Sequence, residues 1–173
     1  MFMKAYKIVV TGPFNAGKTA FVRTASDIAI VSTEQRITST LASEDKTQTT
    51  VALDYGHAKV GNVLLHLYGT PGQERFEFMW GILSHKTDAF ILLVDSEDRG
   101  SLMDAVQMLR LMRKNRRAPY LVAANKQDGG KALSPEEIAR LLKLPASVPV
   151  VSCVAHDTRS VRRVLKRMVG ILA

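Results

Sequence analysis

The first candidate site is a segment with the spacing of a phosphate-binding loop. Residues 12–19, which read Gly-Pro-Phe-Asn-Ala-Gly-Lys-Thr, fit the pattern G-x-x-x-x-G-K-[ST]. The glycines of this pattern let the backbone curl so that its N–H groups point at phosphate oxygens, and the following helix adds its positive N-terminal end. Lys18 would reach the β- and γ-phosphates of a nucleotide, and the hydroxyl of Thr19 would bind Mg²⁺. The nucleotide contacts predicted in this segment are those of Asn15, Ala16, Gly17, Lys18, Thr19 and Ala20.

A second short motif predicts which base the nucleotide carries. Residues 125–128, Asn-Lys-Gln-Asp, directly follow the apolar run 120–124. The carboxylate of Asp128 can accept two hydrogen bonds, one from guanine N1–H and one from the exocyclic amine. Adenine has no such pair of donors, so an unpaired Asp128 would disfavour ATP. We therefore predict that Asn125, Lys126 and Asp128 bind the guanine end of GTP or GDP.

The elements that must position these motifs alternate between short apolar runs and helical periodicity. This alternation is typical of an α/β domain with a largely parallel sheet. Strands are predicted over residues 6–11, 50–60, 63–68, 89–95, 120–125 and 148–153. The second and third of these are joined at Gly61-Asn62, a two-residue hairpin turn that makes one strand antiparallel.

Helix start signals lie between the strands. Helices are predicted to begin at Lys18, after Ser101, and at the capping box of residues 134–137, which opens a helix over 138–144. A last helix carries an apolar stripe from Val161 to Leu172. Residues 32–49 show no clear periodicity, which is typical of a functional loop. The prediction is one α/β domain over residues 1–173 with three α/β/α layers, six mostly parallel strands and about five helices.

Composition restricts the cellular compartment in which this domain is expected. The 173 residues are 46% hydrophobic, and the single cysteine, Cys153, excludes an internal disulfide framework. No apolar run is long enough for a signal peptide or a spanning helix, and neither end carries a lipidation motif, so we expect a cytoplasmic protein.

The net charge of +8 has two interpretations. The basic residues gather in two stretches, 110–117 and 159–167, and such runs usually form solvated helix faces. The alternative is an anionic target. Specific nucleic-acid binding is not expected, because these stretches lack interleaved aromatics for base stacking, whereas weak contact with an anionic membrane stays open.

Together, these motifs resemble those of the Ras-superfamily small GTPases over nearly the whole chain. Residues 72–76, Gly-Gln-Glu-Arg-Phe, are similar to the second switch of that family, and residues 152–155 take the place of its third base-contacting loop. Residues 94–99 resemble Arf-type members, and Gly69–Gln73 most resembles the bacterial gliding-motility (MglA-type) GTPases and related prokaryotic proteins. The resemblance implies a phosphate-loop GTPase fold.

The resemblance also implies roles for individual residues. The catalytic residues would be Gln73, which orients the attacking water, and Lys18, which contacts the β- and γ-phosphates; the Gly72 N–H would contact the γ-phosphate. Thr50 would give its hydroxyl to Mg²⁺ when GTP is bound, unless its threonine-rich segment is a loop without metal contact. The third loop would bring Cys153 and Val154 to the base, with Cys153 acting through its backbone and not as a nucleophile.

The sequence departs from the family pattern at Gly69. Most members have aspartate there, which holds Mg²⁺ through its water shell, and glycine has no side chain to do so. Our hypothesis is that Asp54, on the neighbouring antiparallel strand, takes over this role. The alternative is that strand alternation turns Asp54 to solvent.

The function implied is a small GTP-binding switch that hydrolyses GTP slowly to GDP and phosphate. Its switch regions would bind a protein effector and a protein activator, and a roadblock-type activator is a candidate by resemblance to the gliding-motility group. The alternative is a nucleotide-dependent binding module with negligible hydrolysis, which Gly69 favours and Gln73 disfavours.

Overall fold

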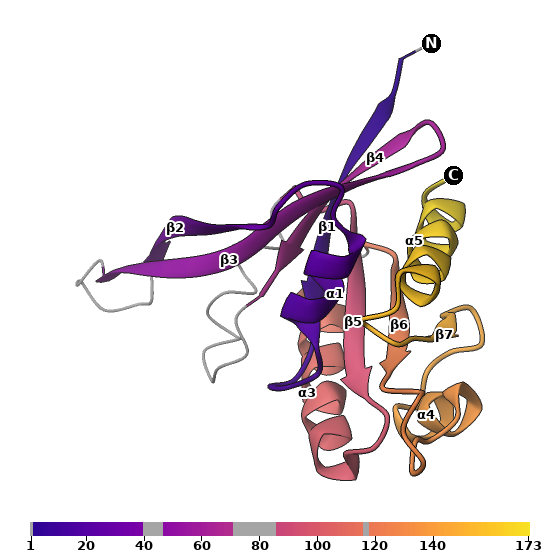
Figure 1. Cartoon of the computed structure of the whole chain (residues 1–173). Coiled ribbons are helices and arrows are strands. Elements are labelled where there is room, and N and C mark those ends of the chain that lie inside the picture. The colour runs from indigo at the N-terminus through magenta and orange to yellow at the C-terminus, as the bar shows by residue number, and fades with distance from the viewer. Residues whose placement is uncertain (1, 40–46, 71–85, 116–117) are drawn as a thin grey trace.

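The computed structural model describes residues 2–39, 47–70, 86–115 and 118–173 (Figure 1). The strands are β1 Lys4–Thr11, β2 Val31–Ser39, β3 Thr47–Val60, β4 Val63–Gly69, β5 Ala89–Asp95, β6 Tyr120–Asn125 and β7 Val150–Ser152. The helices are α1 Lys18–Ala25, α3 Arg99–Asn115, α4 Pro135–Leu141 and α5 Thr158–Leu172. These four helices in the described residues compare with about five predicted.

The strands form one seven-stranded sheet in the order β2-β3-β4-β1-β5-β6-β7. β1 is parallel to β4 and β5, and the series continues in parallel through β6 to β7. β3 is antiparallel to both β2 and β4, so it is the one strand that runs against the others, as predicted. The turn at Gly61, whose φ is 59°, joins β3 to β4.

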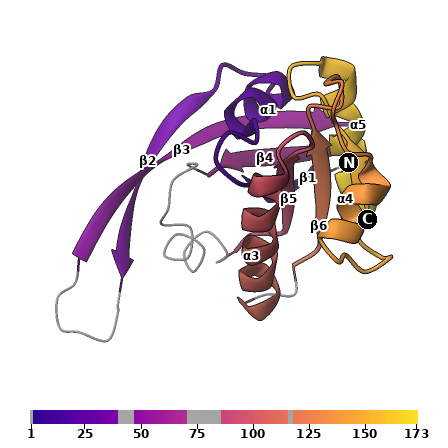
Figure 2. The same cartoon turned by 90° about the horizontal axis from the view of Figure 1, so that it is seen from below.

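The seventh strand, β2, corrects the prediction of six. All of it but Val31 lies in the stretch that shows no periodicity, and it pairs with β3 from Val31↔Tyr55 to Ser39↔Thr47. The hairpin of β2 and the first part of β3 extends beyond the helices (Figures 1 and 2). Main-chain pairing at such an edge requires no buried apolar face, so the hydrophobic pattern that reveals the other strands is absent here.

Helices cover both faces of the sheet and give the three predicted layers (Figure 2). One apolar core lies beneath α1 and α5, and it contains Phe21, Val22, Val161, Val164, Leu165 and Met168. The second core lies on the opposite face beneath α3 and α4, and it contains Leu102, Ala105, Leu109, Met112, Ile138 and Leu142. β5 is buried along its whole length because both cores pack on it.

Helix boundaries follow the capping side chains. The predicted capping box of α4 is present, with the Ser134 side chain accepting from the Glu137 N–H and the Glu137 carboxylate accepting from the Ser134 N–H. α4 starts at Pro135 and ends at Leu141, short of the predicted Leu144, and Lys143 has a φ of 50°, which no α-helix continues through.

Several other predicted boundaries were wrong. β1 begins at Lys4 and not at residue 6, and β3 begins at Thr47 and not at residue 50. α3 begins at Arg99 and not after Ser101, because the Asp98 carboxylate accepts from the Ser101 N–H at 3.1 Å and so caps the helix three residues earlier. β7 begins at Val150 and not at residue 148, and Pro149 before it has no N–H to donate to a strand ladder. In the described part of the chain no helix has the length and apolar character needed to cross a membrane.

Candidate functional site

The predicted phosphate-binding loop connects the end of β1 to α1 and lies against the neighbouring strand β5. A Cβ atom at Gly12 would run into the carbonyl oxygen of Leu93 on β5, so only glycine fits at this approach. Gly17, the N-cap residue of α1, has a φ of 99°, and a Cβ there would meet the side-chain nitrogen of Asn125. Asn15 lies between them with a φ of 62°, a conformation that is uncommon outside glycine and that gathers at functional sites.

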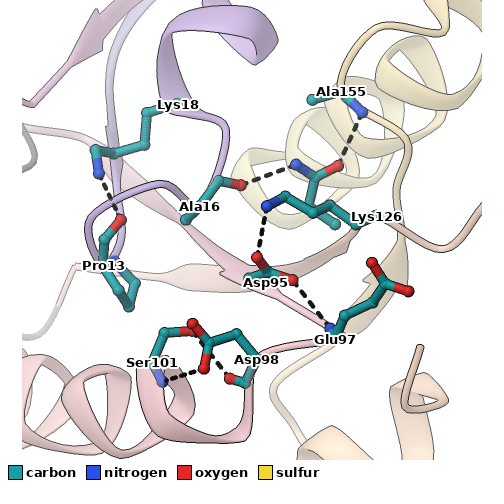
Figure 3. A network of polar contacts seen from close by, with 10 residues as sticks. Pro13, Ala16, Lys18, Asp95, Glu97, Asp98, Ser101, Lys126 and Ala155 are labelled. Carbon is teal, nitrogen blue, oxygen red and sulfur yellow. Dashed lines mark hydrogen bonds and ion pairs between the residues drawn. The ribbon is translucent and has the colours of Figure 1, made fainter. Parts of the chain in front are cut away.

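Lys18 points back over this loop (Figure 3). Its Nζ donates to the carbonyl oxygens of Gly12 and Pro13, both at 2.8 Å. The residue is 6% exposed, and burial lowers the pKa of its ammonium group to about 8. The loop therefore holds a cationic donor in place at the N-terminus of α1, where an anion is also favoured by the helix dipole.

Asn125 joins the predicted phosphate and base loops. Its side-chain nitrogen donates to the Ala16 carbonyl at 2.8 Å, and its side-chain oxygen accepts from the Ala155 N–H at 2.8 Å. Asn125 is 3% exposed, so both bonds are shielded from water. The structure thus brings together residues 12–19, 125–128 and 152–155 through one buried amide.

Sequence reasoning missed Asp95, which positions Lys126. Asp95 ends β5, and its carboxylate contacts Lys126 Nζ at 2.5 Å and accepts from the Glu97 N–H at 2.9 Å (Figure 3). Lys126 has a φ of 63°, so its backbone conformation is also unusual. The signal was an acid at the end of an otherwise apolar strand, but its partner lies in the turn directly after the next strand of the sheet, β6.

Gln127 holds the same turn from the other side. Its amide nitrogen donates to Ser96 Oγ and to the Leu133 carbonyl, both at 2.8 Å. Asp128 follows, and its side chain is 53% exposed, with His156 Nε2 3.6 Å from its carboxylate. The turn therefore fixes its backbone through Lys126 and Gln127 and leaves the Asp128 carboxylate accessible to a ligand.

The loop after β7 uses its backbone groups internally. The Cys153 N–H donates to the Ala124 carbonyl at 2.8 Å, and the Cys153 carbonyl accepts from the Gln127 N–H at 3.2 Å. Its thiol is buried, and burial raises the pKa of that thiol to about 12, which disfavours the nucleophilic thiolate. The Val154 N–H donates to Ser160 Oγ at 2.8 Å. Cys153 and Val154 thus lie next to the predicted base loop, residues 125–128. Their contact with a nucleotide stays a prediction.

The predicted metal ligand Thr19 contacts Asp54. Thr19 Oγ1 donates to the Asp54 carboxylate at 2.6 Å, although the two residues are 35 positions apart. Asp54 on β3 is the cross-strand partner of Gly69 on β4. The structure therefore places the threonine, the acid and the glycine at one point beside the start of α1.

The remaining predicted residues lie partly outside the described structure. Ala20 is half-buried in the first turn of α1 and packs on the core beneath that helix. Thr50 lies in β3 opposite Arg36 of β2, and its side chain is outside the described part. Gly72 and Gln73 lie outside the described residues altogether, so their roles stay predictions.

Comparisons with known proteins show the family and the fold of the chain. The family model described as Arf, the ADP-ribosylation factor family, matches residues 1–170. ADP-ribosylation factor-like protein 3 of Caenorhabditis elegans is 30% identical over 141 residues, which are 80% of this chain and 70% of that protein. Human ADP-ribosylation factor-like protein 4C is 35% identical over 105 residues, 59% of this chain and about half (54%) of that protein.

A solved structure shows the same fold. The Arl6 (BBS3) small GTPase of Trypanosoma brucei, with the bound nucleotide analogue GppNp, has a TM-score of 0.74 at 21% identity, and the match covers 98% of each chain. These relatives support the Arf-type part of the resemblance. The likeness to the bacterial gliding-motility group stays a prediction.

Proposed function

Because the chain belongs to the ADP-ribosylation factor family of Ras-superfamily small GTPases, we propose that it binds GTP and GDP with Mg²⁺ and slowly hydrolyses GTP. In this proposal GTP orders the switch regions so that they bind a protein effector, and hydrolysis to GDP and phosphate ends that interaction. The enzyme would act on the bond between the β- and γ-phosphates.

The observation that carries the proposal is the buried amide of Asn125. It bonds to the phosphate loop at Ala16 and to the base loop at Ala155, both at 2.8 Å. This fixes the spacing between the Lys18 ammonium, which suits a phosphate, and the accessible Asp128 carboxylate, which suits the donor edge of guanine. A guanine nucleotide would satisfy both ends, and this supports the proposal.

The residues also fit a magnesium ion. Thr19 is exposed at the start of α1 and lies within hydrogen-bond distance of a carboxylate, and Mg²⁺ prefers such oxygen ligands. When bound, Mg²⁺ would neutralise charge that develops on the phosphates. Lys18 would do the same from the loop side, and Gln73 would orient the attacking water. Hydrolysis would be slow without a partner, because an arginine supplied by an activator protein commonly provides several orders of magnitude of rate.

The first prediction tests the base assignment at Asp128. An amide at this position keeps one acceptor but replaces the other with a donor, so it mismatches the exocyclic amine of guanine and matches the carbonyl of xanthine. We expect Asp128→Asn to weaken GDP binding at least about 100-fold and to bind xanthosine diphosphate more tightly than the native protein does. Fluorescence or calorimetric titration of both nucleotides measures this.

Asp104→Asn is the matched control, because it removes the same charge from an exposed position on α3. It should bind GDP as the native protein does. Equal binding of GDP and ADP by the native protein, or ATP or ADP as the nucleotide that co-purifies, would overturn the guanine assignment.

Gly69 favours a second candidate function, a binding module that holds GTP with negligible turnover. The aspartate that most family members use to support Mg²⁺ is missing there, whereas Gln73 retains the side chain expected to orient water. Single-turnover hydrolysis of GTP by the native protein and by Gln73→Leu separates the two. We expect the native protein to cleave GTP at a measurable rate and the variant to cleave it at least about tenfold more slowly. If neither protein cleaves the GTP that it binds, the binding module is the function that remains.

Partners are proposed at the switch regions, residues 47–54 and 73–80. These segments would change with the γ-phosphate, so an effector that contacts them reads which nucleotide is bound. A roadblock-type protein is a candidate activator through the likeness to the gliding-motility group. Pull-down with the protein loaded with a non-hydrolysable GTP analogue or with GDP would identify partners that prefer one state.

A further inference from the structure

Asp54 and Gly69 face each other across two strands. They are register partners in the antiparallel pair β3–β4. A Cβ atom added at Gly69 would lie 3.4 Å from Asp54 Cβ and 3.3 Å from Val22 Cγ2. Side chains at positions 54 and 69 would therefore occupy the same space beside α1. The φ of Gly69 lies outside the left-handed region, and the backbone would accept another residue there.

The face on which Asp54 lies is covered by a helix. Alternate residues of β3 point to opposite sides of the sheet. Leu53 is buried in the core beneath α3 and α4, whereas Ala58 is buried in the core beneath α1 and α5. A Cβ atom at Gly56 would meet Ser26 and Val22, which also belong to the α1 side. Asp54 shares the face of Gly56 and Ala58, so strand alternation does not turn it to solvent away from the site.

The contact with Thr19 connects this carboxylate to the predicted metal position. Thr19 Oγ1 donates its proton to Asp54 Oδ2 at 2.6 Å. A hydroxyl that donates a hydrogen bond to a carboxylate keeps its oxygen lone pairs available for a cation. The negative charge of the carboxylate orders water around that cation. The N-terminus of α1 adds a favourable field for the carboxylate.

On the basis of the proposed nucleotide and Mg²⁺ binding, we propose that Asp54 is the positioning residue for Mg²⁺ in this chain, so that the supporting carboxylate is moved from β4 to the facing position of β3. Asp54 orients the Thr19 hydroxyl and accepts hydrogen bonds from the water shell of the ion. Gly69 makes room for it, because a second acid at 69 would occupy the same space and repel the first.

The test measures the release of fluorescent GDP across a Mg²⁺ titration, and after excess EDTA, for three variants. Asp54→Asn keeps the size of the side chain but loses its charge. Asp54→Ala/Gly69→Asp returns the carboxylate to β4. Asp104→Asn is the charge-matched control on the exposed face of α3.

We expect Asp54→Asn to require about 10–100-fold more Mg²⁺ for half-maximal slowing of release, with an EDTA rate like that of the native protein. The double variant should recover most of the native Mg²⁺ requirement, and the control should match the native protein. Equal EDTA rates show that the fold and the nucleotide site are intact, so a shift in Mg²⁺ requirement alone reports the metal.

Each contrary result has its own meaning. If the native protein and the control do not bind GDP, the proposed function fails. If they bind GDP and Asp54→Asn responds to Mg²⁺ within about twofold of native, Asp54 only caps the hydroxyl of Thr19 and the inference is overturned. A double variant that keeps the native EDTA rate but does not regain Mg²⁺ sensitivity would overturn the transfer of the carboxylate between strands.

Discussion

At the scale of single residues, Lys18 carries the charge on which the proposed phosphate binding would depend, and its buried surroundings disfavour that charge. Burial lowers the pKa of its ammonium group to about 8, from 10.5 for an ordinary lysine. Bound phosphates favour the charged form and so raise that pKa again. The proposed nucleotide binding would therefore be coupled to uptake of a proton above pH 8.

This coupling predicts that GDP affinity falls as pH rises through 8. The dissociation constant should grow by up to about tenfold per pH unit above the free pKa, because an ever larger fraction of the free protein must first be protonated. Titration calorimetry of GDP at pH 7, 8 and 9 measures the slope. Lys18→Met binds more weakly and should lack this part of the slope, so parallel profiles in the two proteins would contradict the assignment.

At the scale of elements, three of the four helices in the described residues begin where a side chain satisfies their first N–H groups. Asp98 does this for α3, Ser134 for α4 and Asp157, which accepts from the Ser160 N–H at 3.0 Å, for α5. α1 is different, since its N-cap is Gly17 without a side-chain cap. The N–H groups at the start of α1 are thus the ones that a bound phosphate would satisfy.

The N-cap of α4 predicts a change in the free energy of unfolding without a change in nucleotide affinity. Ser134→Ala removes one half of the capping box and should lower the free energy of unfolding by about 1 kcal/mol, with GDP affinity unchanged. Urea denaturation measures the loss. Ser147→Ala, at an exposed position in the loop after α4, is the matched control and should be neutral; equal stability of the two variants would show that the cap contributes nothing.

At the scale of the whole molecule, the sequence predicted the layers and most strands because burial leaves a pattern. β5 and β6 have the predicted bounds, and the apolar stripe of α5 is buried with its arginines, such as Arg163 and Arg167, on the exposed side. These side chains therefore lie on an exposed helix face, as both interpretations of the basic stretch require, whereas Arg162 bonds to Asp27 and to the Lys59 carbonyl. Weak contact of this face with an anionic membrane stays a prediction.

What the sequence could not predict depends on contacts between distant segments. β2 is held by main-chain pairing at an edge, which no side-chain pattern records. The role of Asp95 requires that β5 and β6 lie side by side, so that Lys126, 31 positions later, meets it. The orientation of Asp54 stayed open because alternation alone leaves two faces, and the register with Gly69 together with the contact to Thr19 decides between them.

The buried amide of Asn125 links the predicted phosphate subsite to the predicted base subsite through its bonds to Ala16 and Ala155. Each subsite alone would bind its part of the ligand weakly, because guanosine or pyrophosphate would contact only one of the two. In GDP the base and the phosphates are covalently joined, and the two loops are already linked to each other. The second contact would therefore form at high effective concentration without further ordering of the loops. The nucleotide would thus be retained as a unit, and loosening either loop would release both ends together.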